Sequence, residues 1–411
     1  MINKSFPQMQ LSDKVSSIPE ALSVYINNIA YEMKRRGERV FQLSLGEAYF
    51  DIPMFSFDEI DFNKGYHYTE SRGLFELRER IAEYYGTQYD APVNPDNEII
   101  LSAGSKPLIF MAIRSILNEG DEVLIHEPAW LSYPEEIKLA GGTPRYIPYD
   151  TTVEHFSDFF SEKTKMVIIC NPNNPTGRVY SKDELLFLYH LCRSKGIYVF
   201  VDEAYSDFVL DDQFHSMISL VPSKDGVIVV NSLSKNMGVS GYRVGYAISN
   251  QKVVYNILKI NQHMITCPAS LILLYLSKYF DKIISITLPQ AKKVVEKRRI
   301  IDLYCRDIGL VPLEGSATFY LFIHVGDYNR TTIELALYLL FMYNICVVPG
   351  SAYGNSTERF VRISVGAETI SDIMDSLQIM KRVIDNNEYD EEIINEKLRD
   401  LGFNKFIDRI E

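Results

Sequence analysis

The chain has 411 residues, of which 46% are hydrophobic and 23% charged, which is typical of a globular protein with more than one core. Its net charge of −12 argues against nucleic acid and anionic membrane surfaces as partners, because both repel an acidic protein. The five cysteines are scattered and form no Cys-x-x-Cys pair, which argues against a zinc site or a disulfide framework.

Scattered thiols favour a reducing compartment. The first residues lack the apolar core of a signal peptide, and the longest apolar stretch, 335–343, is too short for a membrane span. We therefore expect a cytoplasmic protein.

The first two thirds of the chain alternate between helical and strand-like patterns. The apolar spacing predicts helices over 19–36, 74–85, 107–117, 133–140 and 182–195. Strands are predicted over 40–45, 99–101, 122–126, 145–148, 166–170, 197–201 and 227–230. This alternation implies a mainly parallel sheet with both faces covered, and ligands bind such sheets at the carboxyl ends of the strands.

The pattern changes near residue 290 to that of a smaller α+β unit. It predicts helices over 290–308, 332–343 and from Ile370, with strands over 319–324, 345–348 and 360–364. The acidic stretch 385–411 is expected to be helical, with an apolar side made by Ile393, Ile394, Leu398, Leu401, Phe403 and Phe406. We expect this tail to pack on the smaller unit or on a partner subunit.

One stretch, 231–247, contains a lysine that is set among small residues after a strand. Ser232 and Ser234 precede Lys235, and Arg243 follows it by eight residues. Such a lysine suits a Schiff base with a phosphorylated aldehyde, while serine and arginine bind the phosphate. The alternative is a solvated loop lysine beside an unrelated arginine.

Three further motifs follow predicted strands. Gly104 and Ser105 join a strand to a helix, an arrangement that binds anions but is common in α/β proteins. Residues 171–177, Asn-Pro-Asn-Asn-Pro-Thr-Gly, present amides, or form only a proline-rich turn. Asp202 closes an apolar run, so we expect a buried carboxylate that pairs with a cation such as a protonated pyridine; it could instead cap the next turn.

In this order, Asn-Pro-x-Asn-Pro-Thr-Gly, Asp-Glu-x-Tyr, Ser-x-Ser-Lys with its arginine, and Arg-Ile-Ser resemble the class I/II aminotransferases over roughly residues 15–385. These are pyridoxal 5′-phosphate enzymes of the aspartate aminotransferase fold (fold type I). The resemblance implies a mainly parallel seven-stranded sheet between helices plus a smaller α+β domain. We expect an arm with part of the small domain (1–47), a large cofactor-binding domain (48–290), a small domain (291–385) and an acidic helical tail (386–411).

The resemblance also implies roles for single residues. Lys235 would be the Schiff-base lysine and proton shuttle, Asp202 would pair with the pyridine nitrogen, and Asn174 and Tyr205 would bind the ring's 3-oxygen. Further cofactor contacts are implied for Gly104, Ser105, Ser232 and Arg243 at the phosphate, Trp130 at the ring face, and Tyr68 at a neighbouring subunit's phosphate. The role of Tyr68 implies a homodimer with shared active sites.

The substrate contacts are implied in the same way. Arg362 and the backbone at Gly46 would bind the substrate α-carboxylate, and Asn174 is a further implied substrate contact. Lys106 resembles a lysine that meets the distal carboxylate of acidic substrates, although it could instead face solvent or the cofactor phosphate. The region 261–268 lacks the arginine of other aspartate aminotransferases, and only His263 there can carry a positive charge. Ala317 replaces a usual glycine, which we expect to reshape the pocket wall.

The implied activity is transfer of an amino group from an L-amino acid, aspartate-like or glutamate-like, to a 2-oxo acid. A lyase of the same fold, such as a C–S β-lyase or a cyclopropane-forming synthase, would use the same cofactor residues. A specialised biosynthetic aminotransferase is a further alternative. A non-catalytic cofactor-binding regulator would need a DNA-binding extension, and neither the charge nor the sequence pattern favours one.

Overall fold

The computed structural model describes residues 9–210 and 214–404 of the chain. Its centre is a seven-stranded sheet with the order β2-β8-β7-β6-β5-β3-β4. Only β8 (Gly245–Ser249) runs antiparallel to its neighbours among these strands, so the expected mainly parallel sheet is confirmed. The remaining strands are β2 (Ile99–Ser102), β3 (Glu122–His126), β4 (Thr143–Ile147), β5 (Thr164–Cys170), β6 (Tyr198–Asp202) and β7 (Val227–Ser232).

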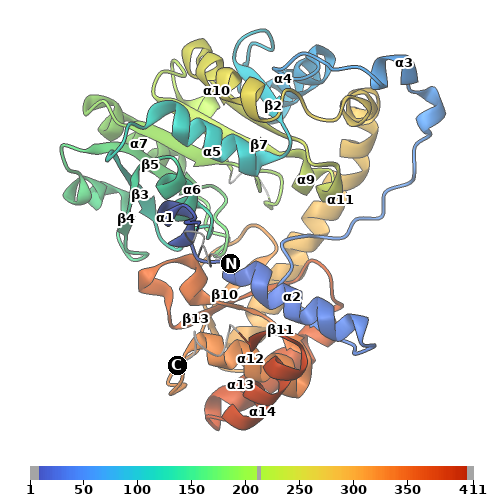
Figure 1. Ribbon diagram of the computed structural model, residues 1–411, viewed down its shortest axis with the longest axis vertical. Helices are drawn as coiled ribbons and strands as arrows, with labels where there is room; N and C mark the ends of the chain where they lie inside the picture. The colour runs from blue at the N-terminus through green and yellow to red at the C-terminus, as the bar shows by residue number, and fades with distance from the viewer. Residues whose placement is uncertain (1–8, 211–213, 405–411) are drawn as a thin grey trace, which may run out of the picture.

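Helices cover both faces of this sheet (Figure 1). Val227 and Val229 of β7 belong to a core shared with α4 (Phe75–Tyr89) and α7 (Lys182–Ser194). Ile228 and Val230 belong to a second core, shared with α5 (Ser105–Ile116), α6 (Tyr133–Leu139) and α10 (Gln251–Met264). Successive strand residues point to opposite faces, and this explains why the strands read as continuous apolar runs in the sequence.

The carboxy-terminal part of the chain forms a four-stranded antiparallel sheet with the order β12-β13-β10-β9. Its strands are β9 (Val311–Pro312), β10 (Tyr320–His324), β12 (Val348–Pro349) and β13 (Phe360–Ser364), and α12 (Thr332–Tyr343) and α13 (Ile370–Asp385) pack with it. The amino-terminal α2 (Leu22–Arg35) shares this core. The expected strand over 40–45 is reduced to β1 (Phe41–Gln42), which pairs with β11 (Ile345–Cys346).

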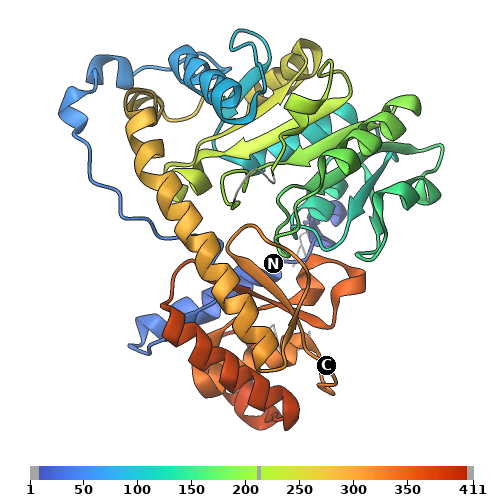
Figure 2. The ribbon, with the colours of Figure 1, turned by 180° about the vertical axis from the view of Figure 1, so that it is seen from behind.

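Helix α11 (Ser270–Asp307), 38 residues long, connects the two parts (Figure 2). It begins far before the helix expected at residue 290. Its buried side chains up to Ile284 join the core of the large sheet, and those from Ala291 onward join the carboxy-terminal core. The packing therefore changes close to the expected boundary at 290, although the helix is continuous, and the proposed division into domains stays a prediction. Across the described residues, no helix is both long and apolar enough to cross a membrane.

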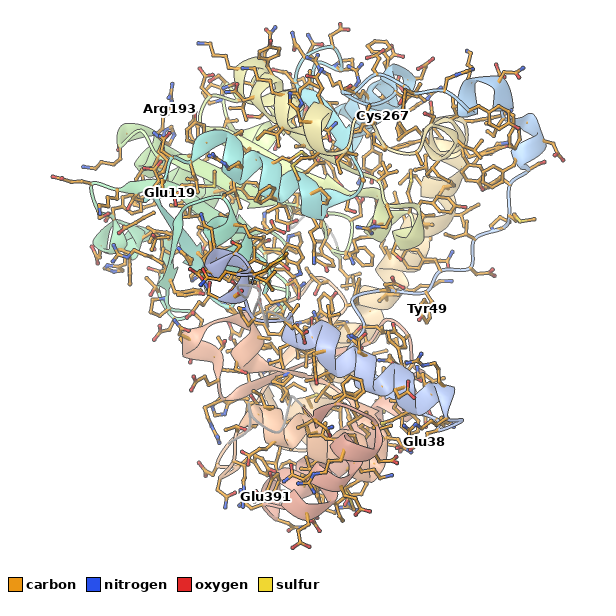
Figure 3. The ribbon with its side chains drawn as sticks, viewed as in Figure 1. Glu38, Tyr49, Glu119, Arg193, Cys267 and Glu391 are labelled. Carbon is orange, nitrogen blue, oxygen red and sulfur yellow. The ribbon has the colours of Figure 1, made fainter. Side chains whose placement is uncertain are left out.

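The acidic tail forms α14 (Glu391–Asp400), which packs on the same chain. Ile394 and Leu398 are buried in the carboxy-terminal core, and the Arg36 guanidinium lies 2.5 Å from the Asp400 carboxylate. Glu391, at the start of this helix, lies at the lower end of the molecule in Figure 3. The expected contact with the smaller unit is thus observed for the described part of the tail, whereas Phe406 lies outside the described residues.

Candidate active site

A cavity of about 260 Å³ lies at the carboxyl ends of β5, β6 and β7. The predicted residues that line it are Gly46, Ser105, Lys106, Trp130, Asn174, Asp202, Tyr205, Ser232, Lys235 and Arg243. Gly46 follows β1, outside the large sheet. The other residues follow different strands of the large sheet and come together because the ends of parallel strands share one edge of the sheet.

Lys235 lies in the short helix α9 (Leu233–Asn236), which follows directly on β7. Its Nζ donates a hydrogen bond to the carbonyl oxygen of Gly46 at 2.5 Å. Desolvation lowers the pKa of this amine to about 8, and the nearby Glu47 carboxylate opposes the shift. A lysine with this pKa can be neutral at moderate pH, as a nucleophile or proton carrier must be.

Asp202 ends β6 at the floor of the cavity and is buried. Its Oδ2 accepts a hydrogen bond from the Tyr133 hydroxyl at 2.7 Å, and its Oδ1 accepts one from the Ala204 N–H at 3.0 Å. Burial raises the pKa of this carboxyl, while the Tyr133 hydrogen bond opposes the increase. Carboxylate oxygens have further acceptor capacity, so the floor can receive a cationic N–H.

An anion pocket lies beside Lys235, where α5 begins at Ser105. A side chain at Gly104, whose φ is +94°, would collide with the Arg243 guanidinium, so glycine permits this close approach. Ser234 adds a buried Oγ that has no hydrogen-bond partner among the described residues. Helix N–H groups, a guanidinium and hydroxyls together match the chemistry of a phosphate.

Arg362 on β13 reaches this region from the carboxy-terminal sheet. Its Nη2 donates to the Ser44 carbonyl at 2.6 Å and its Nη1 to the Asn174 Oδ1 at 3.3 Å, and its guanidinium lies 4.3 Å from the Tyr320 ring centre. Its Nε is buried and lacks a hydrogen-bond partner within the described part of the chain. This arginine therefore keeps donor capacity for a carboxylate.

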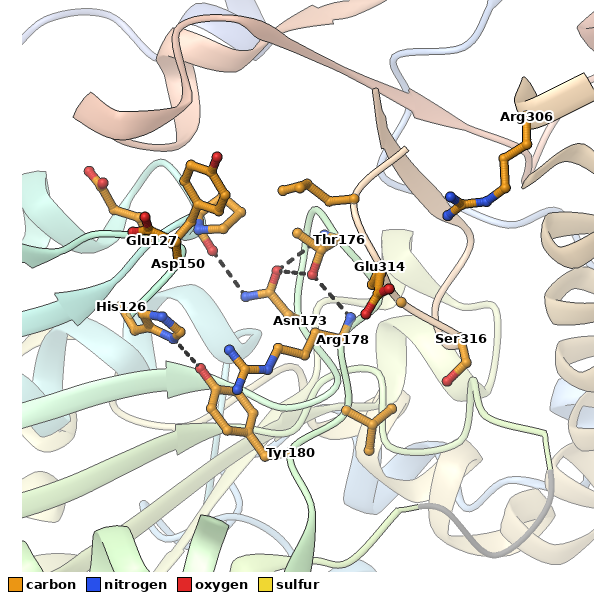
Figure 4. Close-up of a pocket in the computed structure, with 15 residues that line it drawn as sticks. His126, Glu127, Asp150, Asn173, Thr176, Arg178, Tyr180, Arg306, Glu314 and Ser316 are labelled. Atoms are coloured by element: carbon orange, nitrogen blue, oxygen red, sulfur yellow. Dashed lines mark hydrogen bonds between the residues drawn. The ribbon is translucent and has the colours of Figure 1, made fainter. Parts of the chain in front are cut away.

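The loop 171–177 separates this cavity from a larger one of about 760 Å³, which Figure 4 shows. Asn174 faces the first cavity, where its Nδ2 lies 3.4 Å from the Tyr205 hydroxyl. Asn173 faces the larger cavity and anchors the loop, since it donates to the Pro128 carbonyl and accepts from Thr176. The described lining of the larger cavity contains none of the predicted site residues.

The sequence profile described as aminotransferase class I and II matches residues 53–377. The chain belongs to this family. It is a transaminase, as its relatives are.

Two curated aminotransferases illustrate the similarity. The aspartate aminotransferase of Thermotoga maritima is 31% identical over 380 residues, which cover 90% of this chain and 98% of the relative. The (5-formylfuran-3-yl)methyl phosphate transaminase of Methanocaldococcus jannaschii is 31% identical over 360 residues, covering 87% and 94%.

Solved aminotransferase structures have the same fold. The Thermotoga maritima aspartate aminotransferase structure superposes with a TM-score of 0.81 at 28% identity, covering 91% of this chain and 100% of the other. The Thermus thermophilus aspartate aminotransferase with maleate gives 0.82 at 25% identity, covering 92% and 100%. The aspartate aminotransferase fold expected from the sequence is therefore confirmed.

Not every predicted aminotransferase residue lines the cavity. Gly104 and Arg362 adjoin it through Arg243 and Asn174, as described above. Tyr68 is 85% exposed and lies outside the cavity on residues 49–68, a mostly exposed segment that we call the exposed arm. Tyr49, labelled in Figure 3, marks the beginning of this exposed arm. His263 is exposed on α10.

The expectation for Ala317 needs correction, because this residue is fully buried and is not part of the described lining of the cavity. Its N–H donates to the Gly177 carbonyl at 3.0 Å, so it supports the loop 171–177 from behind. Ala317 therefore does not reshape the cavity wall directly.

Several residues that contact the predicted site residues were not predicted from the sequence. Tyr133 bonds Asp202, Glu47 acts on the Lys235 pKa, and the Tyr320 hydroxyl lies 3.0 Å from that of Tyr205. Tyr133 begins α6 and its ring centre lies 5.3 Å from that of Trp130, which precedes the helix, so no helical spacing relates the two in the sequence. No local pattern distinguishes Glu47 or Tyr320.

Proposed function

We propose that this transaminase binds pyridoxal 5′-phosphate in the cavity at Lys235. Members of the family use this cofactor, and three features of the cavity support its binding here. Lys235 would hold the cofactor covalently, the buried Asp202 would meet its pyridine nitrogen, and the anion pocket at Ser105, Ser232 and Arg243 would bind its phosphate. Asn174 and Tyr205 would bind the 3-oxygen, and Trp130 would cover one face of the ring. Gly104 has no side chain and so leaves room for the Arg243 guanidinium at the phosphate.

The bound cofactor supplies an electron sink that makes the substrate Cα–H acidic. Residues of the chain would bind the substrate and move the proton. Arg362, with the backbone at Gly46, would grip the substrate α-carboxylate and so orient its Cα. The substrate amino group would take the place of Lys235 on the cofactor. The freed Lys235 amine, with its pKa near 8, would take the proton from Cα and return it elsewhere on the bound pair. The juxtaposition of this amine with the buried Asp202 and the donor-rich Arg362 carries the proposal most directly.

We propose an L-amino acid as donor and a 2-oxo acid as acceptor, with an aspartate-like or glutamate-like substrate favoured. Lys106 lines the cavity, with its Nζ 4.9 Å from the Trp130 ring centre, and it offers a cation for a distal carboxylate. The relatives named as aspartate aminotransferases support the same choice.

The visible absorption of the purified protein tests this function. We expect a yellow protein that aspartate or glutamate alone bleaches, with release of the corresponding 2-oxo acid. A lyase would instead release its product while the yellow form persists through turnover. A protein that cannot be reconstituted with pyridoxal phosphate would overturn the proposal.

We further propose a cytoplasmic homodimer with shared active sites and the domain division at 47, 290 and 385. The arm that bears Tyr68 supports the dimer, because the Met54 and Tyr66 residues on it are 91% and 77% exposed in the single chain. Exposed apolar side chains gathered on one segment are typical of an interface. Tyr68 would then reach the cofactor phosphate in the other subunit.

A further inference from the structure

Glu127 follows strand β3 and is only 2% exposed. Its Oε1 accepts the Asn355 N–H at 2.5 Å, and its Oε2 accepts the Ser356 N–H at 3.1 Å and the Ser356 hydroxyl. These donors belong to one loop of the carboxy-terminal part, 228 and 229 positions later in the chain. We call the three hydrogen bonds the Glu127 clasp. A buried carboxylate needs such donors to offset the loss of water, so the clasp ties the two parts of the chain together.

The loop is shaped to admit this carboxylate. A side chain at Gly354, whose φ is +147°, would begin 2.4 Å from the Glu127 Oε1, so glycine permits the close approach to the N–H groups that follow it. The Ser356 Oγ also accepts the Tyr149 N–H at 3.4 Å, and Tyr149 follows strand β4. The loop is therefore held at the ends of two neighbouring strands of the large sheet.

The residues after Glu127 lead directly to the candidate active site. The Ala129 N–H donates to the Tyr353 carbonyl at 2.8 Å, and the Tyr353 ring centre lies 5.4 Å from the Arg362 guanidinium. Trp130, the next residue, lines the candidate active site. The clasp thus lies between the wall of the cofactor cavity and the arginine that is proposed to bind the substrate.

A second route joins the same segment to Arg362. Asn173 donates to the Pro128 carbonyl at 3.0 Å, as Figure 4 shows. The next residue, Asn174, accepts a hydrogen bond from the Arg362 Nη1 at 3.3 Å. The arginine is therefore held on two sides by neighbours that are themselves fixed to residues 128 and 129.

We propose that Glu127 is a positioning residue for the transaminase reaction. Its carboxylate fixes the loop 354–356, and through this loop it holds Arg362 where the substrate carboxylate has to lie for Lys235 to reach Cα. The proposal rests on the proposed binding of the α-carboxylate by Arg362. Glu127 does not belong to the described lining of the cofactor cavity, so it acts only through other residues. A displacement of about 1 Å at the reacting groups is enough to slow a reaction strongly.

Glu127→Gln tests the clasp with the smallest change in shape. The amide retains one acceptor oxygen, but its NH₂ group meets a second donor of the loop, so at least one hydrogen bond is lost. In the cofactor-free protein, the amide hydrogens of Asn355 and Ser356 should exchange with solvent about tenfold faster than in the wild type. Glu154→Gln is the matched control, because Glu154 is exposed, and it should leave both rates unchanged. Unchanged exchange in Glu127→Gln would overturn the proposal.

Two reagents distinguish the position of Arg362 from the state of the cofactor site. Aminooxyacetate and methoxyamine both capture the cofactor carbonyl through an aminooxy nitrogen and release the Lys235 amine, but only aminooxyacetate carries a carboxylate. In the cofactor-loaded enzyme, Glu127→Gln should slow capture by aminooxyacetate about tenfold and leave capture by methoxyamine unchanged. Equal losses with the two reagents would mean that Glu127 supports only the fold.

A double-mutant cycle shows whether Glu127 acts through Arg362. Arg362→Ala should remove most of the advantage of aminooxyacetate over methoxyamine, and Glu127→Gln should then cause no further loss. Losses that simply add would overturn the positioning role. If Glu127→Gln does not fold, Ser356→Ala removes only the hydroxyl donor of the clasp and should give the same selective loss at a smaller size. A Ser356→Ala enzyme without this loss would overturn the proposal as well.

Failure of the proposed function looks different, because it is visible before Glu127 is changed. If the purified protein holds no cofactor at Lys235, neither reagent changes the absorption of the wild type. If Arg362 does not bind the carboxylate, Arg362→Ala leaves the advantage of aminooxyacetate intact.

Discussion

The Nζ of Lys235 lies 2.5 Å from the carbonyl oxygen of Gly46, although the two residues are 189 positions apart in the chain. The amine that follows the large sheet is thus held by backbone that leads out of β1. This contact joins the proposed Schiff-base lysine to the backbone at Gly46, which is proposed to bind the substrate carboxylate.

The first prediction concerns the rate at which the cofactor-free protein takes up pyridoxal phosphate. Only the neutral amine can react, and the pKa of Lys235 is lowered from 10.5 to about 8. The uptake rate, followed by absorbance, should therefore rise as the pH passes through about 8 and then level. Glu47→Gln removes a carboxylate that raises this pKa, so the midpoint should move to lower pH. A midpoint near that of free lysine would contradict the assignment.

The second prediction concerns Arg362. Arg362→Ala should raise the KM of every α-amino acid by about one and a half to three and a half orders of magnitude, because removing one partner of a buried charge-assisted pair costs about 2–5 kcal/mol. The control is Arg299→Ala, since Arg299 is exposed and its ion pair among the described residues is with Glu296. Steady-state kinetics with several donors checks it. A loss confined to one donor would mean that Arg362 recognises a side chain instead.

The third prediction concerns assembly. Sedimentation should give a mass close to twice the 47.2 kDa of one chain. Tyr68→Phe should leave the dimer intact and raise the Kd of pyridoxal phosphate about tenfold, as expected for one hydrogen bond to an anion. Tyr66→Phe, on the same exposed arm, should bind the cofactor normally. A monomeric protein with full activity would rule out shared sites.

The fourth prediction concerns stability and pH. Burial raises the pKa of Glu203 from 4.5 to about 8, and Ser216 and the Met217 N–H donate to its carboxyl. The folded protein thus keeps a proton that the unfolded chain loses, so this contribution is fully present below pH 4.5 and is lost as the pH rises through about 8. The Tm of the cofactor-free protein should fall over that range. Glu203→Gln should flatten the fall, and an unchanged slope would assign it to other groups.

The fifth prediction concerns the tail. Leu398 is fully buried against the carboxy-terminal core, so Leu398→Ala should lower the free energy of unfolding by about 2–5 kcal/mol. Glu396→Ala, on the exposed side of the same helix, should change it little. Denaturant unfolding measures both variants. Equal stability of the two would mean that α14 is not part of the cooperative core.

Much of the sheet was predictable because buried parallel strands leave continuous apolar runs, and β3 and α12 begin and end where the sequence indicated. Antiparallel β8 was missed. It starts at Gly245, a residue that weakens a strand pattern and that admits the close approach of Ser105. Helix α10 was not predicted either.

Part of the site was predictable for a similar reason, since side chains such as Asn174, Asp202 and Ser232 follow strands that end at one edge of the sheet. The contact of Arg362 with Asn174 was foreseeable only from the family resemblance, because it joins residues 188 positions apart. The cavity between segment 18–22, helix α6 and loop 351–355 left no local pattern, since these segments meet only after both parts of the chain have packed.

Helix α11 connects the two cores that hold the two halves of the site, the large sheet with Lys235 and the small sheet with Arg362. At 1.5 Å per residue it is about 57 Å long. Pro289 lies inside it, close to the point where its packing changes from one core to the other, and a proline removes the hydrogen bond to the carbonyl four residues earlier. The helix therefore lacks a backbone hydrogen bond between the two cores. A small bend at this point would change the distance between Arg362 and Lys235.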